Sequence, residues 1–257
     1  MSKDDRGERT PLTGRRLAAA MMQLERETRG APRELQLIGH SKGGLVARVA
    51  LNELQRMLHD GAGGTLLPRA GFSTIQFTAV DTPWDGFAHE PTWLTRLQEP
   101  LLTGVMAVLG LQGAQDLRAS SAMFAGLYAT RLDDVTTSVI AARQLPLEAD
   151  GIRSIHDLAP RELRALVRFA CHGTEPPTLR VRNLALGVAQ DERWPRVQAE
   201  LAPLATRAAL DGPESESDVE WVTSVLQAFE RHMPSIAATH SDIIQQPELF
   251  ERLLRPR

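Results

Sequence analysis

The segment Gly39-His40-Ser41-Lys42-Gly43-Gly44 combines residue types and a spacing that suit nucleophilic chemistry. It contains Gly-x-Ser-x-Gly, the spacing that lifts a serine hydroxyl on a sharp turn between a strand and a helix. Such a turn favours glycine two positions before and after the serine, where side chains would collide. An apolar stretch precedes the motif and a helical pattern follows it. We therefore predict that Ser41 is a nucleophile; the alternative is a glycine-rich turn with an inert serine.

The start of the following helix would favour the negative charge that forms when a hydroxyl attacks a carbonyl. A helix N-terminus presents backbone N–H groups and the positive end of the helix dipole. We expect the backbone N–H of Lys42 to donate a hydrogen bond to that oxyanion. His40 is expected to point off the turn and to play a supporting part.

The elements that would position this turn alternate between strands and helices along the chain. Strands are predicted at 34–39, 72–80, 179–189 and 235–239. Helices are predicted at 13–28, 43–58, 92–130 in two pieces, 154–170, 193–210, 218–231 and 247–254. This alternation predicts an α/β fold, with a mainly parallel sheet flanked by helices.

Composition and length narrow the classes of protein. The 257 residues fit a single domain, and 42% hydrophobic with 24% charged residues is ordinary globular composition. The net charge of −3 gives no general attraction to nucleic acid. The single cysteine, Cys171, excludes an internal disulfide and a multi-cysteine metal site, and we expect it to be buried. We predict no cofactor and no metal, and, without a signal peptide or a membrane span, a cytoplasmic location by default.

Residues 88–172 are predicted to form a helical cap inserted within the domain. The stretch 92–130 is unusually apolar over a wide helical face. One interpretation is a cap over Ser41 that binds an acyl chain and moves at a lipid surface, with transient contact to a membrane. The other is a helical pair packed as core, and periodicity does not separate the two.

Four segments resemble the lipase and esterase branch of the α/β-hydrolase superfamily. They are the turn and helix at 37–48, the segment Ala79-Val-Asp-Thr-Pro-Trp-Asp-Gly86, Ile155-His-Asp-Leu-Ala-Pro160, and Thr239-His-Ser-Asp-Ile-Ile244. The resemblance implies an α/β-hydrolase fold and cleavage of carboxylic esters, with a small-molecule or lipid ester as substrate. It also implies several strands before Ser41, whereas only about 33 residues precede the first predicted strand. We therefore expect an N-terminally incomplete domain, open at one sheet edge to a partner or to the missing segment.

The resemblance also implies a base and an acid for Ser41, in the chain order serine, acid, histidine. His240, near the C-terminus, is expected to be the base; the alternative is a loop histidine that caps the next helix. For the acid we expect Asp218, whose surroundings are similar to a lipase segment, with Asp191 and Asp211 as alternatives. The alternative for each of these aspartates is a solvated loop carboxylate.

Ester hydrolysis through an acyl-enzyme is the leading functional hypothesis. A non-catalytic, hydrolase-like interaction protein is the rival from a different class. An acyltransferase or a thioesterase would use the same turn with a different acceptor or substrate.

Overall fold

A computed structural model of the protein contains a parallel sheet, and the predicted turn at Ser41 follows one of its strands. The structure describes residues 9–27, 34–58, 72–86, 121–128, 132, 134–143, 154–176, 178–208 and 216–254, with only the backbone of residues 25, 207, 208 and 216–218.

Three strands, β1 (Glu34–His40), β2 (Thr74–Val80) and β3 (Val135–Ile140), pair in the order β1-β2-β3, all parallel. The register places His40 beside Val80, and Val80 beside Ile140. The carboxyl ends of all three strands therefore meet at one edge, and the residues that follow them emerge side by side. The predicted α/β class with a parallel sheet is confirmed.

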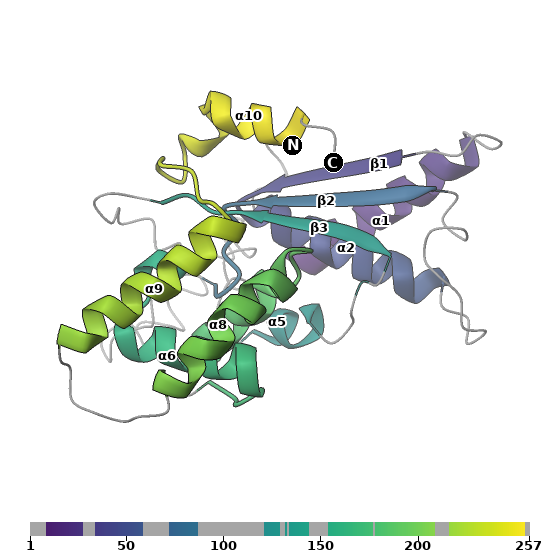
Figure 1. Cartoon of the computed structure of the whole chain (residues 1–257). Helices are drawn as coiled ribbons and strands as arrows, with labels where there is room; N and C mark the ends of the chain where they lie inside the picture. The colour runs from purple at the N-terminus through teal and green to yellow at the C-terminus, as the bar shows by residue number, and fades with distance from the viewer. Residues whose placement is uncertain are drawn as a thin grey trace, which may run out of the picture.

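Helices α1 (Thr10–Glu27) and α2 (Lys42–Leu58) pack on each other and lie on one side of the sheet, with α10 (Pro247–Leu254) on the other (Figure 1). Leu45, Leu51 and Leu54 of α2 are fully buried, and α2 packs against both α1 and strand β1. This packing fixes the helix that begins immediately after Ser41.

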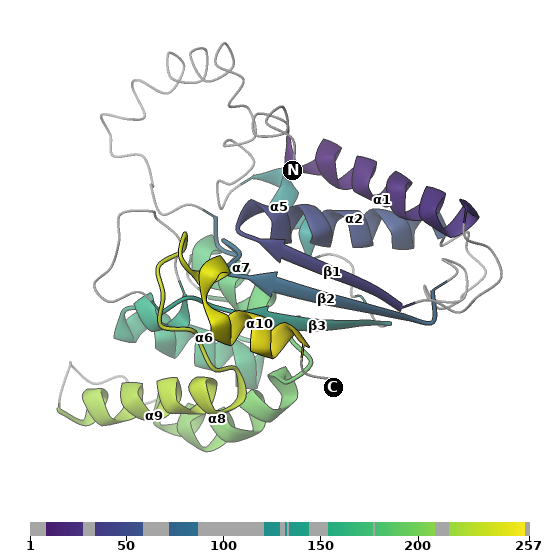
Figure 2. The same cartoon turned by 90° about the horizontal axis from the view of Figure 1, so that it is seen from above.

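A second group of helices packs beyond β3 (Figure 2). It contains α6 (Pro160–His172), α7 (Leu179–Val188), α8 (Trp194–Ala208) and α9 (Glu216–His232), in which α6 contacts the other three. A short helix, α5 (Ala122–Leu127), contacts α2. Their buried residues join those of the sheet and of α1 and α2 in one hydrophobic core.

The strand predicted at 179–189 is wrong, because this segment forms helix α7. Buried residues lie almost all round α7, so its apolar pattern has no clear period. Thr178 caps the helix by accepting a hydrogen bond from the backbone N–H of Val181. The other predicted helices at 13–28, 43–58, 193–210, 218–231 and 247–254 agree with the structure within three residues at each end. Residues 154–170 divide into a single 3-10 turn, η3 (Ile155–Asp157), and α6.

Strand β3 was missed by the sequence prediction and lies inside the range 88–172 that was predicted as a helical cap. Its polar residues Thr137 and Ser138 are buried with the apolar ones, so the sequence Val-Thr-Thr-Ser-Val-Ile shows no alternation. The range is therefore not a wholly helical insertion, since it contributes a strand to the main sheet. Most of the apolar stretch 92–130 lies outside the described residues.

The C-terminal segment returns to the carboxyl edge of the sheet. Of the strand predicted at 235–239, the structure has one parallel bridge, between Ile236 and Ala142. A second, smaller apolar cluster holds this segment to the ends of β2 and β3; its buried members are Val80, Ile140, Ala142, Ile236, Ile243 and Leu249. Ile236 and Ile243 therefore anchor both ends of the short loop between them.

This anchoring predicts different costs for two adjacent isoleucines. Ile243 is completely buried and Ile244 is 45% exposed. Ile243→Ala should lower the free energy of unfolding by about 2–4 kcal/mol, because it leaves a cavity in a small cluster. Ile244→Ala should change it by less than about 0.5 kcal/mol. Urea unfolding of both variants measures the difference, and equal costs would contradict the anchoring.

Candidate active site

Ser41 occupies the sharp turn between β1 and α2. Its φ of 55° lies in the left-handed region, which costs a non-glycine residue of order 1–3 kcal/mol. Two backbone hydrogen bonds hold this conformation: Ser41 N–H donates to the Val80 carbonyl, and Gly44 N–H donates to the Ser41 carbonyl, each at 3.0 Å. The predicted strand–turn–helix context of Ser41 is therefore present.

The glycines of the turn have different reasons to be there. A Cβ added at Gly39 would lie 2.6 Å from the backbone Cα of Gly44, and one at Gly44 would overlap the side chain of Thr82. A Cβ at Gly43 would meet nothing within 4 Å. The collision expected on both sides of the serine thus holds for Gly39 and not for Gly43.

His240 lies at the same edge of the sheet, hydrogen-bonded to a carboxylate. Its Nδ1 is 2.6 Å from Oδ2 of Asp81, and both side chains are largely buried. A histidine whose Nδ1 donates to a carboxylate presents Nε2 as its basic nitrogen. This pair supplies an oriented base beside the turn.

The orientation of Asp81 is fixed by backbone contacts. Asp81 follows β2 directly, with a φ of 42°, and its N–H donates to the Ile140 carbonyl at 2.7 Å. Its Oδ1 accepts a hydrogen bond from the Ala142 N–H at 2.9 Å. Each carboxylate oxygen therefore has its own partner, and Oδ2 is held toward His240.

His40 joins the loop of His240 to the turn. The two rings stack with centroids 4.6 Å apart, and His40 Nε2 lies 2.9 Å from the backbone carbonyl of His240. Because a carbonyl only accepts, Nε2 of His40 carries the proton. Burial lowers the pKa of His40, while its hydrogen bond to the His240 carbonyl acts in the opposite direction. Because its pKa is lowered, His40 stays neutral. It therefore adds no positive charge beside His240 when His240 takes up a proton.

Within the described residues, Ser41 and His240 form no hydrogen bond with each other, and His40 is the residue that connects them. Ser41 is adjacent in sequence to His40, whose ring stacks on that of His240. Catalytic serine–histidine contacts are often loose before substrate binds and tighten in the substrate complex.

The acids expected from the sequence lie elsewhere. Asp191 is buried beyond β3, where its carboxylate accepts from the Val139 N–H at 2.7 Å and pairs with Arg193. Asp218 lies in the first turn of α9, at the end directed away from the sheet in Figure 1. About 20 Å of helix separates it from the end of α9 that approaches the site. Asp211 lies outside the described residues. The partner of His240 is instead Asp81, and this is a correction to the expected site.

Asp81 carried a signal that the sequence prediction missed. It directly follows the strand next to the one that bears Ser41, so the parallel register brings it to the same edge. It also satisfies the order serine, acid, histidine. Of the expected acids, Asp191 depended on the strand predicted at 179–189, which is helix α7, and Asp218 depended on a similarity to a lipase segment.

Lys42 is the first residue of α2, as expected for the residue whose backbone N–H was predicted to stabilise the oxyanion. Cys171 is free and only partly buried, against the expectation that it is buried. Within the described ranges, no three His, Cys, Asp or Glu side chains are grouped to hold a metal ion. In that same part of the chain, no helix has the length and apolarity needed to cross a bilayer.

The unequal glycines lead to a prediction about the turn. Gly39→Ala should destabilise the protein by about 1–3 kcal/mol, because its Cβ meets backbone that cannot turn aside. Gly43→Ala should be neutral or stabilising by up to about 1 kcal/mol, because it places alanine in open space within a helix. Thermal unfolding of both variants tests this. A larger loss for Gly43→Ala than for Gly39→Ala would show that the geometry of the turn is misread.

Comparison with known proteins gave a family match to the first half of the chain. Residues 9–128 match the family described as Putative serine esterase (DUF676). The matched segment contains Ser41 and Asp81, and ends before His240. Comparisons with curated proteins and with solved structures gave no match. The match confirms the resemblance to esterases of the α/β-hydrolase type and indicates a serine hydrolase.

Proposed function

We propose that the protein hydrolyses carboxylic esters, with Ser41 as nucleophile, His240 as general base and acid, and Asp81 as the carboxylate that orients His240. The observation that carries this proposal is the 2.6 Å contact between Asp81 Oδ2 and His240 Nδ1, formed beside the strained turn of Ser41. The family match to serine esterases supports the reaction class.

In the first half of the reaction, Ser41 Oγ attacks the acyl carbon and its proton passes to His240 Nε2. The carbonyl oxygen becomes an oxyanion, and we assign the backbone N–H of Lys42, at the start of α2, to stabilise it. The bond between the acyl carbon and the alcohol oxygen then breaks. His240 returns the proton to that oxygen, so that a neutral alcohol leaves an acyl-serine.

In the second half, water replaces the alcohol. His240 takes a proton from the water as its oxygen attacks the acyl-serine, and gives it to Ser41 Oγ as the acid leaves. Asp81 stays ionised throughout and stabilises the imidazolium formed in each half. The prediction that the ester is a lipid came from the resemblance and from residues 92–130, most of which lie outside the described structure, and it stays a prediction.

Removing the nucleophile gives the first functional prediction. Ser41→Ala should abolish measurable hydrolysis of p-nitrophenyl esters, a loss of at least about 10³-fold, since no acyl-enzyme can form. It should also abolish labelling by a fluorophosphonate, which reacts only with an activated serine. Circular dichroism of the variant serves as the folding control.

Two outcomes would argue against this function. Equal ester hydrolysis by wild type and Ser41→Ala would place the reaction elsewhere. A folded wild type that neither hydrolyses esters nor accepts the fluorophosphonate would favour the non-catalytic interaction protein.

Replacing the carboxylate tests the assignment of the acid. Asp81→Asn should lower kcat by about 10³–10⁴-fold, because an amide cannot stabilise the imidazolium and favours the wrong tautomer of His240. Asp218→Asn, which alters the acid expected from the sequence, should stay within about twofold of wild type. Steady-state kinetics on one ester measures both variants. A crippled Asp218→Asn beside an active Asp81→Asn would reassign the acid.

A further inference from the structure

The loop that carries His240 is held by apolar contacts at its two ends and by polar contacts in its middle. Ile236 and Ile243, at the ends, are almost completely buried, whereas residues 237–242 are exposed or half-buried. Among the described residues, two hydrogen bonds join residues 237–242 to the strand ends. One runs from His240 Nδ1 to Asp81, and the other joins His40 to the backbone carbonyl of His240. The position of the proposed base therefore depends on these two contacts.

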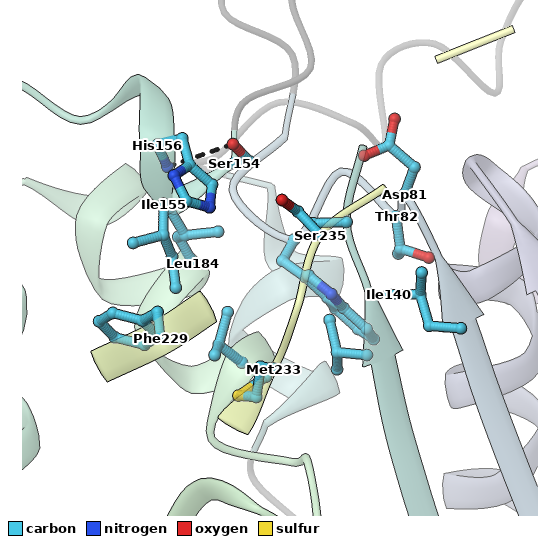
Figure 3. A pocket seen from close by; sticks show the side chains of 14 residues that line it. Asp81, Thr82, Ile140, Ser154, Ile155, His156, Leu184, Phe229, Met233 and Ser235 are labelled. Atoms are coloured by element: carbon cyan, nitrogen blue, oxygen red, sulfur yellow. Dashed lines mark hydrogen bonds between the residues drawn. The ribbon is translucent and has the colours of Figure 1, made fainter. Parts of the chain in front are cut away.

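The contact with Asp81 fixes only one edge of the His240 ring. Packing does not add a constraint on the side of Asp81 that faces the second helical group, because a cavity of about 40 Å³ lies there. Figure 3 shows Asp81 on one side of this cavity and Ile155 and Leu184 facing it. A void offers its lining no van der Waals partners. The backbone of His240 therefore needs a second contact if the base is to stay in one place.

His40 provides that second contact from a fixed position. It is the last residue of β1 and lies beside Val80 in the register, so the sheet holds its backbone. Ser41 follows it directly, and the Ser41 N–H donates to the Val80 carbonyl at 3.0 Å. The nucleophile and the support of the base therefore start from the same point at the end of β1.

The hydrogen bond from His40 acts on the backbone of His240. His40 Nε2 lies 2.9 Å from the carbonyl oxygen, and a carbonyl only accepts, so the imidazole of His40 is the donor. A neutral imidazole has a single N–H, and this contact requires the tautomer that carries it on Nε2. In the other tautomer, the lone pair of Nε2 would face the carbonyl oxygen and repel it. The contact therefore makes a definite demand on the state of His40.

The ring of His40 also restricts the ring of His240. The two centroids are 4.6 Å apart and the two planes differ by 25°, so one face of each ring lies against the other. Rotation of the His240 ring about its Cβ–Cγ bond would drive an edge of that ring into His40. The ring is therefore limited at one edge by Asp81 and over one face by His40, while its backbone is held by the N–H of His40.

We propose that His40 is a positioning residue for ester hydrolysis, whose Nε2–H holds the backbone carbonyl of His240 and so keeps the general base within reach of Ser41. This inference rests on the proposed ester hydrolysis and adds a residue that acts through His240. A reacting group displaced by about 1 Å can lose about 10²-fold in rate, so one hydrogen bond at this point has a measurable effect on turnover.

The test separates the N–H of His40 from its ring. His40→Phe keeps a flat ring for the stack and removes the N–H. It should lower kcat for p-nitrophenyl butyrate by about tenfold or more, the worth of one neutral hydrogen bond, with KM within about twofold. His40→Gln offers an N–H at a similar distance from the backbone without the ring, and should recover kcat to within about threefold of wild type. His232→Phe is the matched control, expected within about twofold, because His232 Nε2 contacts Glu200 of α8 away from the strand ends.

Heteronuclear NMR of the histidine side chains measures the same link without any ester. In wild type at neutral pH, His40 should carry its proton on Nε2, and His240 should show a protected proton on Nδ1. His40→Phe should broaden or remove the Nδ1 proton signal of His240, and His40→Gln should keep it. A role of His40 confined to fold stability would lower the midpoint of thermal unfolding and leave these signals of the folded protein in place.

The outcomes separate this inference from the function on which it rests. If wild type hydrolyses esters and His40→Phe keeps its kcat, or His40→Gln loses as much as His40→Phe, the positioning role of the N–H is overturned and the hydrolase stands. A wild-type His40 that carries its proton on Nδ1 overturns it as well, even where a variant does not fold. If no ester is hydrolysed and Ser41 is not labelled by a fluorophosphonate, the proposed function fails, and the positioning role fails with it.

Discussion

The hydrogen bond between Asp81 and His240 is the interaction on which the whole site depends. It joins residues 159 positions apart in the chain and occupies the Nδ1 of the histidine. The other carboxylate oxygen accepts from Ala142, so the orientation of Asp81 is set by the way the chain leaves β3. A base with a fixed Nδ1 partner presents Nε2 in one direction, and this directionality makes a histidine useful beside a serine.

The parallel register makes that interaction available. Ser41 and Asp81 each follow the last residue of a strand. Each has a positive φ, which residues other than glycine rarely adopt. The neighbouring strand stabilises each of them, since Ser41 donates to Val80 and Asp81 donates to Ile140. Strained backbone at the ends of two neighbouring strands persists only where the surrounding structure fixes both residues. The strain is therefore part of how the site projects its side chains away from the sheet.

Two apolar groups of unequal size support the two halves of the site. The main core holds β1, β2 and α2, and so fixes Ser41 and Asp81. The smaller cluster around Ile236 and Ile243 holds the loop of His240. His40 connects the halves, because it is the last residue of β1 and contacts the ring and the carbonyl of His240. The base is thus held by fewer buried contacts than the nucleophile, and depends more on its polar partners.

The sequence by itself determined the local part of this structure. The spacing around Ser41, an apolar strand before it and a helical repeat after it are consecutive in the chain, so their period and glycine positions are visible without the fold. His240 was found from its place near the end of the chain together with a resemblance. Helices α2, α8, α9 and α10 were located because each shows its period over several turns.

Only the tertiary structure decided the partner of His240 and the composition of the sheet. Leu179–Val188 and Val135–Ile140 were misread or missed because each is buried on nearly all sides, and burial on all sides erases the period that distinguishes a helix from a strand. The strand wrongly predicted at 179–189 favoured Asp191 as an alternative acid, whereas Asp218 was expected from a resemblance. Asp81 is chosen by register, a relation between segments distant in sequence that hydrogen bonds and packing set together, and no local pattern of residues encodes it.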